Sequence, residues 1–155
     1  MFISIDPDDD PRRNRFRAFE EDLRDGDAYF RRAEEFRGDG YGHSLVFNVA
    51  AMALERYLVG LCHLHGVEPE NHNFICLMDA VGTVVSVPPE LDGKIRYLDE
   101  SIFSICSLDD YRHGAPEKED ADPIMGLCRQ VRGMFDPEGI ASIRAELKLD
   151  GNEGA

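Results

Sequence analysis

The sequence has no tryptophan and few cysteines, and no two of these cysteines form a C-x-x-C pair. The four are Cys62, Cys76, Cys106 and Cys128. Each lies in an apolar segment, which favours reduced thiols that pack as small hydrophobic side chains. Cys62-His63-x-His65, with His72 nearby, is one cluster of potential ligands, whereas structural zinc sites usually combine two. We therefore expect no metal site and no bound cofactor.

Positive charge is also scarce. The sequence has 17 Lys and Arg residues but 31 Asp and Glu residues, which gives a net charge of −14. Phosphate backbones repel such a protein, so nucleic-acid binding would need a local basic patch. No uninterrupted apolar run approaches the ~20 residues that span a bilayer. The first ten residues, MFISIDPDDD, lack the basic start and the apolar stretch of a signal peptide. These features predict a soluble, cytoplasmic protein without a membrane segment.

Several common catalytic motifs are missing. The sequence contains no G-x-x-x-x-G-K-[ST], no G-x-G-x-x-G after a strand, no G-x-S-x-G and no H-E-x-x-H. The sequence therefore offers no P-loop, dinucleotide-binding, α/β-hydrolase or zincin site.

The 155 residues are 43% hydrophobic and 31% charged, which suits one globular domain. Acidic and basic blocks alternate over residues 1–23, and such alternation is typical of a solvated segment. We predict an irregular N-terminal arm at 1–23, a helical domain at 24–148 and a frayed tail at 149–155. An RNA-binding arm is the alternative for the arginines of 12–17, but the flanking acids disfavour it.

A long helix is predicted at 44–65, because its hydrophobic residues recur at helical spacing and fill most other positions. Gly66 and Pro69 end it. A helix that is apolar nearly all round is surrounded by other helices, so this one should be the central helix of the domain.

Helical patterns flank this central helix on both sides. One begins near Asp25, a third follows a cap at 70–72, and a fourth begins at Pro89 with an apolar seam spaced 4, 3, 4 and 3. Asp122-Pro123 and Asp136-Pro137 resemble helix starts, for a fifth helix and a short sixth. Short connections favour antiparallel neighbours. We therefore predict an all-α, up-and-down antiparallel bundle of about five helices.

The central helix carries a polar strip formed by Asn48, Glu55, Arg56 and His63. Seven residues advance a helix by almost two turns, so Asn48 aligns with Glu55, and Arg56 aligns with His63. The strip either meets solvent or forms internal ion pairs, or it binds a ligand. In the second interpretation Arg56 and His63 would hold an anion such as a nucleotide phosphate, for which the planar arginine fork is suited.

A second candidate is the segment Asp109 to Gly114, directly after the fourth helix. It contains Tyr111, Arg112 and His113, a combination that suits ligand binding or acid–base chemistry in a loop. The alternative is an ordinary helix end with favourable basic residues and a glycine stop.

Taken together, residues 25–136 resemble the HEPN (higher eukaryotes and prokaryotes nucleotide-binding) domain family. The central helix SLVFNVAAMALERYLVGLCHLHG, with its A-x-A-L-E-x-x-L core, is similar to the second helix of that family. Pro69-x-x-His72 resembles the histidine that opens its third helix, and PPELDGKIRYLDESIF with the following Asp110-Tyr111-Arg112 resembles its later helices.

The resemblance implies a small, commonly dimeric helical bundle that acts in toxin–antitoxin systems, in RNA cleavage or beside a nucleotidyltransferase. Catalytic members share an R-x(4–6)-H motif on a late helix. Here His113 directly follows Arg112, and the spacing from Arg37 to His43 lies before the central helix. We therefore expect a noncatalytic, homodimeric module that binds a nucleotide or a partner protein. The alternatives are a metal-independent ribonuclease using Arg112 and His113, and a purely structural or regulatory bundle.

Overall fold

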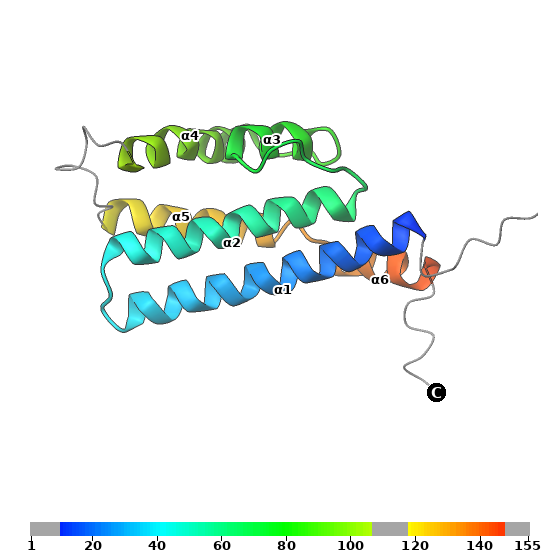
Figure 1. The fold of residues 1–155 in the computed structure, drawn as a ribbon, viewed down its shortest axis with the longest axis horizontal. Helices are drawn as coiled ribbons and strands as arrows, with labels where there is room; N and C mark the ends of the chain where they lie inside the picture. The colour runs from blue at the N-terminus through cyan, green and yellow to red at the C-terminus, as the bar shows by residue number, and fades with distance from the viewer. Residues whose placement is uncertain (1–9, 107–117, 148–155) are drawn as a thin grey trace, which may run out of the picture.

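The computed structural model describes residues 10–106 and 118–147, without the side chains of 101–106 and 118–120. Over these ranges the chain is helical and contains no strand, which confirms the predicted all-α bundle (Figure 1). The helices are α1 (Pro11–Gly38), α2 (His43–Leu64), α3 (Phe74–Gly82), α4 (Pro89–Cys106), α5 (Lys118–Arg132) and α6 (Pro137–Glu146). Figure 1 shows α1 and α2 running antiparallel, with α3 and α4 stacked above α2 and with α5 behind it.

Helix α1 begins at Pro11, so the prediction of an irregular arm is wrong for residues 11–23. Asp10 is the N-cap, and its Oδ1 accepts a hydrogen bond from the backbone N–H of Arg12 at 2.9 Å. Phe16 and Phe19, three residues apart, are buried in the core. These two side chains anchor the start of α1, and Ala33 is the third hydrophobic residue of this helix that is buried in the core. Residues 1–9 lie outside the described ranges.

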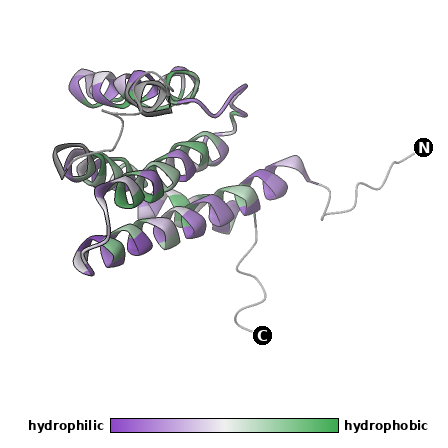
Figure 2. Ribbon diagram, turned by 60° about the vertical axis from the view of Figure 1, so that its left-hand side comes forward, coloured by the Kyte–Doolittle hydropathy of each residue, from purple (hydrophilic) through white to green (hydrophobic). Residues whose placement is uncertain are grey.

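Helix α2 is the predicted central helix, and its burial is confirmed. Most of its side chains between Val46 and Cys62 are buried, and it packs against α1, α3 and α5. Figure 2 shows by colour that hydrophobic residues predominate along this helix. By length and composition α2 could cross a membrane, but 67% of its apolar window is buried within the protein. Neighbouring helices therefore cover most of the apolar surface of α2. Each fully buried leucine of this kind contributes about 1.5–3 kcal/mol relative to an exposed one.

Helices α3 and α4 pack against each other and are joined by a carboxylate. The N-cap of α3 is Asn73 rather than a residue at 70–72. Asp99 of α4 accepts hydrogen bonds from the first two backbone N–H groups of α3, at 2.8 Å each. A carboxylate at a helix N-terminus also complements the helix dipole. In α4, the seam residues Leu91, Ile95 and Leu98 are buried as predicted.

Of the two Asp-Pro pairs predicted to begin a helix, only Asp136-Pro137 does so. Asp136 caps α6 as predicted, and its Oδ1 accepts from the N–H of Glu138 at 3.2 Å. In contrast, α5 begins at Lys118, so the prediction that it starts at Asp122 is wrong and Pro123 lies inside the helix. Ala121, buried one residue before Asp122, continues the apolar face of α5 toward its N-terminus.

Ion pairs join α1 to the two C-terminal helices. They are Arg37 with Asp122, Asp27 with Arg132, and Glu20 with Arg144, at 3.0, 2.9 and 3.1 Å. The pairs are partly exposed, so each contributes only about 0–1 kcal/mol. Their main effect is to fix the register between α1 and the C-terminal helices.

Candidate functional site

Arg56 and His63, which the sequence places on one line of α2, both contact Asp22 of α1. Arg56 Nη1 lies 3.2 Å from Asp22 Oδ1, and His63 Nδ1 lies 2.6 Å from Asp22 Oδ2. Asp22 is only 5% exposed and is the one buried charged residue among the described side chains. Burying a carboxylate is costly unless it is paired, and here two cationic groups pair with it.

The His63 imidazole lies between two carboxylates. Its second ring nitrogen, Nε2, is 2.8 Å from Glu68 Oε2, in the segment after α2. Ionised carboxylates only accept hydrogen bonds, so this position favours the cationic ring, in which both nitrogens carry hydrogen. The hydrogen bond to Asp22 is the main cause that raises the pKa of His63; Glu68 adds to it, and burial opposes it. His63 therefore acts as a charged link between α1 and the segment after α2.

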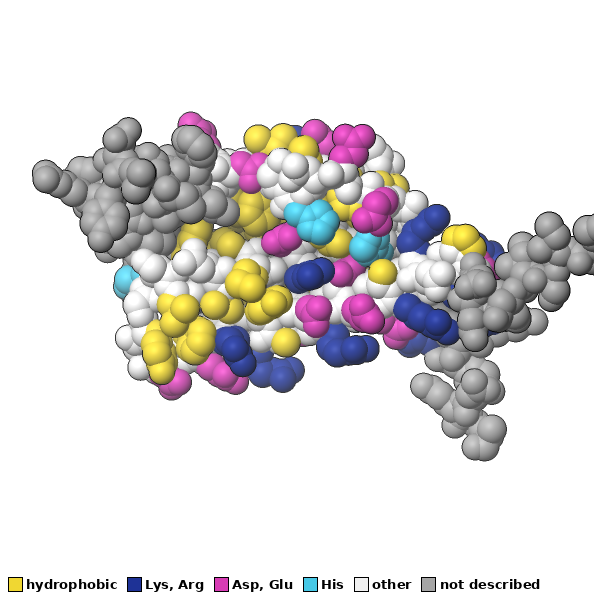
Figure 3. Space-filling model, in the orientation of Figure 1, with side chains coloured by type: hydrophobic (Ala, Val, Ile, Leu, Met, Phe, Trp, Pro, Cys, Tyr) yellow, Lys and Arg dark blue, Asp and Glu magenta, His cyan; other side chains and the backbone are white. Residues whose placement is uncertain are grey.

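The other members of the strip are also in reach of solvent. Glu55 Oε1 is 3.1 Å from Nδ1 of His72, while Asn48 is exposed. Figure 3 shows this alternation of histidine, arginine and acidic side chains over the C-terminal half of α2. Of the two interpretations of the strip, internal ion pairing accounts for the contacts of Arg56, His63 and Glu55.

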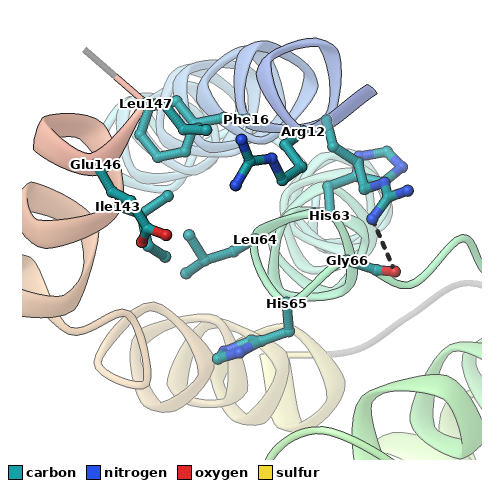
Figure 4. Close-up of a pocket in the computed structure, with 10 residues that line it drawn as sticks. Arg12, Phe16, His63, Leu64, His65, Gly66, Ile143, Glu146 and Leu147 are labelled. Carbon is teal, nitrogen blue, oxygen red and sulfur yellow. Dashed lines mark hydrogen bonds between the residues drawn. The ribbon is translucent and has the colours of Figure 1, made fainter. Parts of the chain in front are cut away.

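A hollow adjoins this strip where α2 ends. It has a volume of about 230 Å³, and its walls come from the start of α1, the end of α2 and the end of α6. We call it the basic hollow, because Arg12, Arg15, His63 and His65 line it and Glu146 is its one acidic lining residue. Figure 4 shows Arg12 pointing toward the space between α1 and α6, with Phe16, Leu64 and Ile143 as apolar walls.

The backbone turn after α2 positions part of this hollow. Gly66 has φ of +80°, a conformation that side-chain-bearing residues rarely adopt, and it turns its carbonyl toward Arg15. Arg15 Nη1 donates to Gly66 O at 3.3 Å (Figure 4). Arg12 is held by an exposed pair with Asp10 at 3.4 Å. Both contacts are long and exposed, so these guanidinium groups keep donors for another acceptor.

The cations of the hollow stand out against the charge of the whole chain. The protein carries a net charge of −14, yet two arginines and the cationic His63 line one small concavity. A concavity lined mainly by one sign of charge concentrates ions of the opposite sign. Chemically the arrangement can hold an anion. It contains no pairing of a nucleophile with a base.

The sequence-predicted residues fall into two groups. Arg56 and His63 meet on Asp22, whereas Tyr111, Arg112 and His113 lie outside the described residues. Sequence reasoning missed Asp22, Arg12 and Arg15, because all three were assigned to an irregular arm. The Asp10-Pro11 pair, the same signal that located α6, could have revealed the helix that carries them.

The cysteines described are free thiols. Cys62 and Cys128 are fully buried, as predicted for core thiols, and Cys76 is partly buried. Burial raises the pKa of Cys62 to about 11 and that of Cys128 to about 12, so both thiols stay protonated. In the described ranges no three His, Cys, Asp or Glu side chains are grouped to hold a metal ion.

Comparison with known proteins gives no relative for this chain. No family model matches it, and no curated protein or solved structure is significantly similar to it.

Proposed function

We propose that this protein is a noncatalytic, HEPN-like helical module of the cytoplasm that binds a nucleotide through its phosphate in the basic hollow. The observation that carries the proposal is the gathering of Arg12, Arg15 and His63 around one concavity of an acidic protein. The all-α bundle with a buried central helix is consistent with the family resemblance.

The contacts favour phosphate over other ligands. Arginine presents a planar fork of donors that matches phosphate oxygens. Arg12 and Arg15 lie one turn apart at the start of α1, where the helix dipole also favours an anion. His63 is already engaged by two carboxylates, which offset its charge, so the arginines donate the hydrogen bonds to the phosphate.

A thermal-shift titration with AMP, inorganic pyrophosphate and adenosine tests this proposal. At ten times its dissociation constant a ligand stabilises the folded state by about 1.4 kcal/mol. For a chain of this size that raises Tm by roughly 3–6 °C. We expect AMP and pyrophosphate to raise Tm and uncharged adenosine to leave it unchanged.

The double variant Arg12→Gln, Arg15→Gln should abolish both shifts. Arg32→Gln is a matched control on the same helix, because it also removes a positive charge but lies about 30 Å from Arg12, twenty residues at 1.5 Å each. Equal shifts with adenosine and AMP, or shifts that survive in the double variant, would refute the proposal.

We also propose that the protein is a homodimer. Tyr41, Leu45 and Met52 are exposed large hydrophobic residues, and Leu45 and Met52 align on α2 at a spacing of seven. In Figure 3 hydrophobic side chains gather over this end of α1 and α2. Sedimentation at tens of micromolar, an order chosen for weak dimers, should give a dimer that Met52→Glu dissociates. A monomer at that concentration contradicts it.

The family resemblance also suggests the kind of system in which the protein acts. We propose that the module acts in a toxin–antitoxin system or with a separate nucleotidyltransferase as its partner. Co-purification with the product of a neighbouring nucleotidyltransferase gene tests the second arrangement. The absence of such a complex at micromolar concentrations of both proteins would count against it.

A further inference from the structure

A second concavity lies away from the basic hollow, between α1, α5 and the start of α6. Its volume is about 500 Å³, within the range of small-molecule sites. Tyr57 of α2, Cys128 of α5 and Phe135 line its inner side, and Phe30 of α1 lines its rim. We call it the α1–α5 groove. The ion pairs of α1 with Arg132 and Asp122 cross the same seam.

Two guanidinium groups stand against aromatic rings in this groove. Arg129 Cζ is 5.4 Å from the centroid of the Phe30 ring, and Arg132 Cζ is 5.8 Å from that of Phe135. Cation–π stacking holds an arginine by its face and leaves the N–H groups at its edge available. Arg129, which makes no carboxylate contact within the described part of the chain, is therefore positioned to bind an acceptor that enters the groove.

The charges of the groove do not cancel. Asp27 accepts from Arg132 Nε at 2.9 Å and from Arg132 Nη2 at 3.3 Å, and the Tyr57 hydroxyl donates to Asp27 at 2.6 Å. Asp27 thus neutralises Arg132. Arg129 is exposed and shows no carboxylate partner among the described side chains. One positive charge remains at the rim of a groove with aromatic walls.

The inner side of the groove is apolar. Cys128 donates from Sγ to the carbonyl of Ala50 at 3.2 Å, and burial raises the pKa of this thiol to about 12, so it is a neutral wall. Tyr57 and Phe135, which are 1% and 4% exposed, close the groove on its core side. An apolar ring suits these walls, while a single negative charge suits Arg129.

We propose that the α1–α5 groove binds a small aromatic carboxylate, with its ring against Phe30 and Phe135 and its carboxylate on Arg129. A monoanion fits better than a dianion, because the Asp27 carboxylate is bonded to Arg132, which lines the groove, and repels a second negative charge. This site is separate from the basic hollow, and it goes beyond the proposed nucleotide binding.

Calorimetric titration with naphthoate, naphthalenemethanol and naphthyl phosphate tests the site. Naphthoate should bind with a dissociation constant of about 1 mM or tighter, the order expected for a ligand of about a dozen heavy atoms. Uncharged naphthalenemethanol should bind at least about fivefold more weakly, because it makes no charge-assisted hydrogen bond. Naphthyl phosphate should bind no more tightly than naphthoate.

Three variants locate the binding. Arg129→Gln should weaken naphthoate binding about tenfold and leave naphthalenemethanol unchanged, since only the charged contact is lost. Lys94→Gln removes a positive charge from an exposed position on α4 and should change the affinity for neither compound. Arg12→Gln, in the basic hollow, should also leave naphthoate binding unchanged. Circular dichroism and Tm confirm that Arg129→Gln, an exposed substitution, is folded.

Any of four results would overturn the proposal. Three of them are the absence of naphthoate binding by the wild-type protein at about 10 mM, ten times the expected dissociation constant, equal affinity for naphthoate and naphthalenemethanol, and full affinity in Arg129→Gln. Loss of binding in Arg12→Gln would place naphthoate in the basic hollow and refute the site as well. None of these results bears on AMP binding, so the two proposals fail independently.

Discussion

Replacing Asp22 with asparagine removes the charge that Arg56 and His63 share. Asp22 is buried and receives both cations, at 3.2 and 2.6 Å, so the change leaves two donors facing a neutral amide. Breaking a fully buried ion pair costs about 3–5 kcal/mol. Arg56 is 39% exposed and regains water, and His63 keeps Glu68. We therefore expect a smaller loss of about 2–3 kcal/mol, with screening by solvent taken into account.

This loss should depend on pH in a defined direction. The folded pKa of His63 is raised, chiefly by Asp22, above its ordinary value of about 6.5. The native state therefore holds a proton that the unfolded chain has released. The stabilisation is complete below about pH 6.5 and is lost as the pH rises through the folded pKa. The penalty of Asp22→Asn should accordingly be largest in mild acid and shrink with rising pH.

Urea unfolding over roughly pH 6 to 9 measures the loss of unfolding free energy in Asp22→Asn and its dependence on pH. In thermal unfolding, a loss of about 2–3 kcal/mol lowers Tm by roughly 4–12 °C. Asp25→Asn is a matched control, because it removes the same charge from an exposed position on α1 and should shift stability by less than about 0.5 kcal/mol. A penalty below about 1 kcal/mol, or one that does not change with pH, would refute the reasoning.

Two further substitutions probe the packing. Asp99→Ala removes both carboxylate hydrogen bonds from the start of α3 and should cost about 1–2 kcal/mol in thermal unfolding, whereas exposed Glu100→Ala should cost little. Gly26→Ala would place a Cβ 2.7 Å from the buried Tyr57 ring and should destabilise by about 1–3 kcal/mol. Gly93→Ala, at a helical glycine where the new Cβ would meet no atom within 4 Å beyond its chain neighbours and its own helix backbone, should stabilise by up to about 1 kcal/mol. The opposite order would contradict the packing described.

The sequence predicts the helices whose boundaries are local and whose core faces are periodic. The apolar pattern of α2 and the seam of α4 locate both helices. Asp136-Pro137 locates α6, because an N-cap and the fixed φ of proline act within a few residues. Helix α1 begins earlier than predicted because its charged blocks obscure two buried aromatic residues. Helix α5 extends past Asp122 because the buried Ala121 prolongs its apolar face.

The candidate site also has a part that the sequence predicts and a part that it does not. Helical periodicity places Arg56 beside His63, and the structure brings both to Asp22. Asp22 lies 34 residues before Arg56, and its position depends on how α1 packs against α2. Periodicity within one helix carries no information on that packing. For the same reason the arginines of the basic hollow could not be joined to His63 from the sequence.

The attachment of α3 to α4 has a consequence for local motion. Asp99 and the ion pair between Arg96 and Asp79, at 2.7 Å, tie these two helices to each other. Helix α3 also packs against α2, whereas neither α3 nor α4 takes part in the packing of α1 against α2. The two helices therefore form a unit that can open together while α1 and α2 stay paired. Backbone amides in α3 and α4 should exchange with solvent deuterium together, ahead of those in the centre of α2.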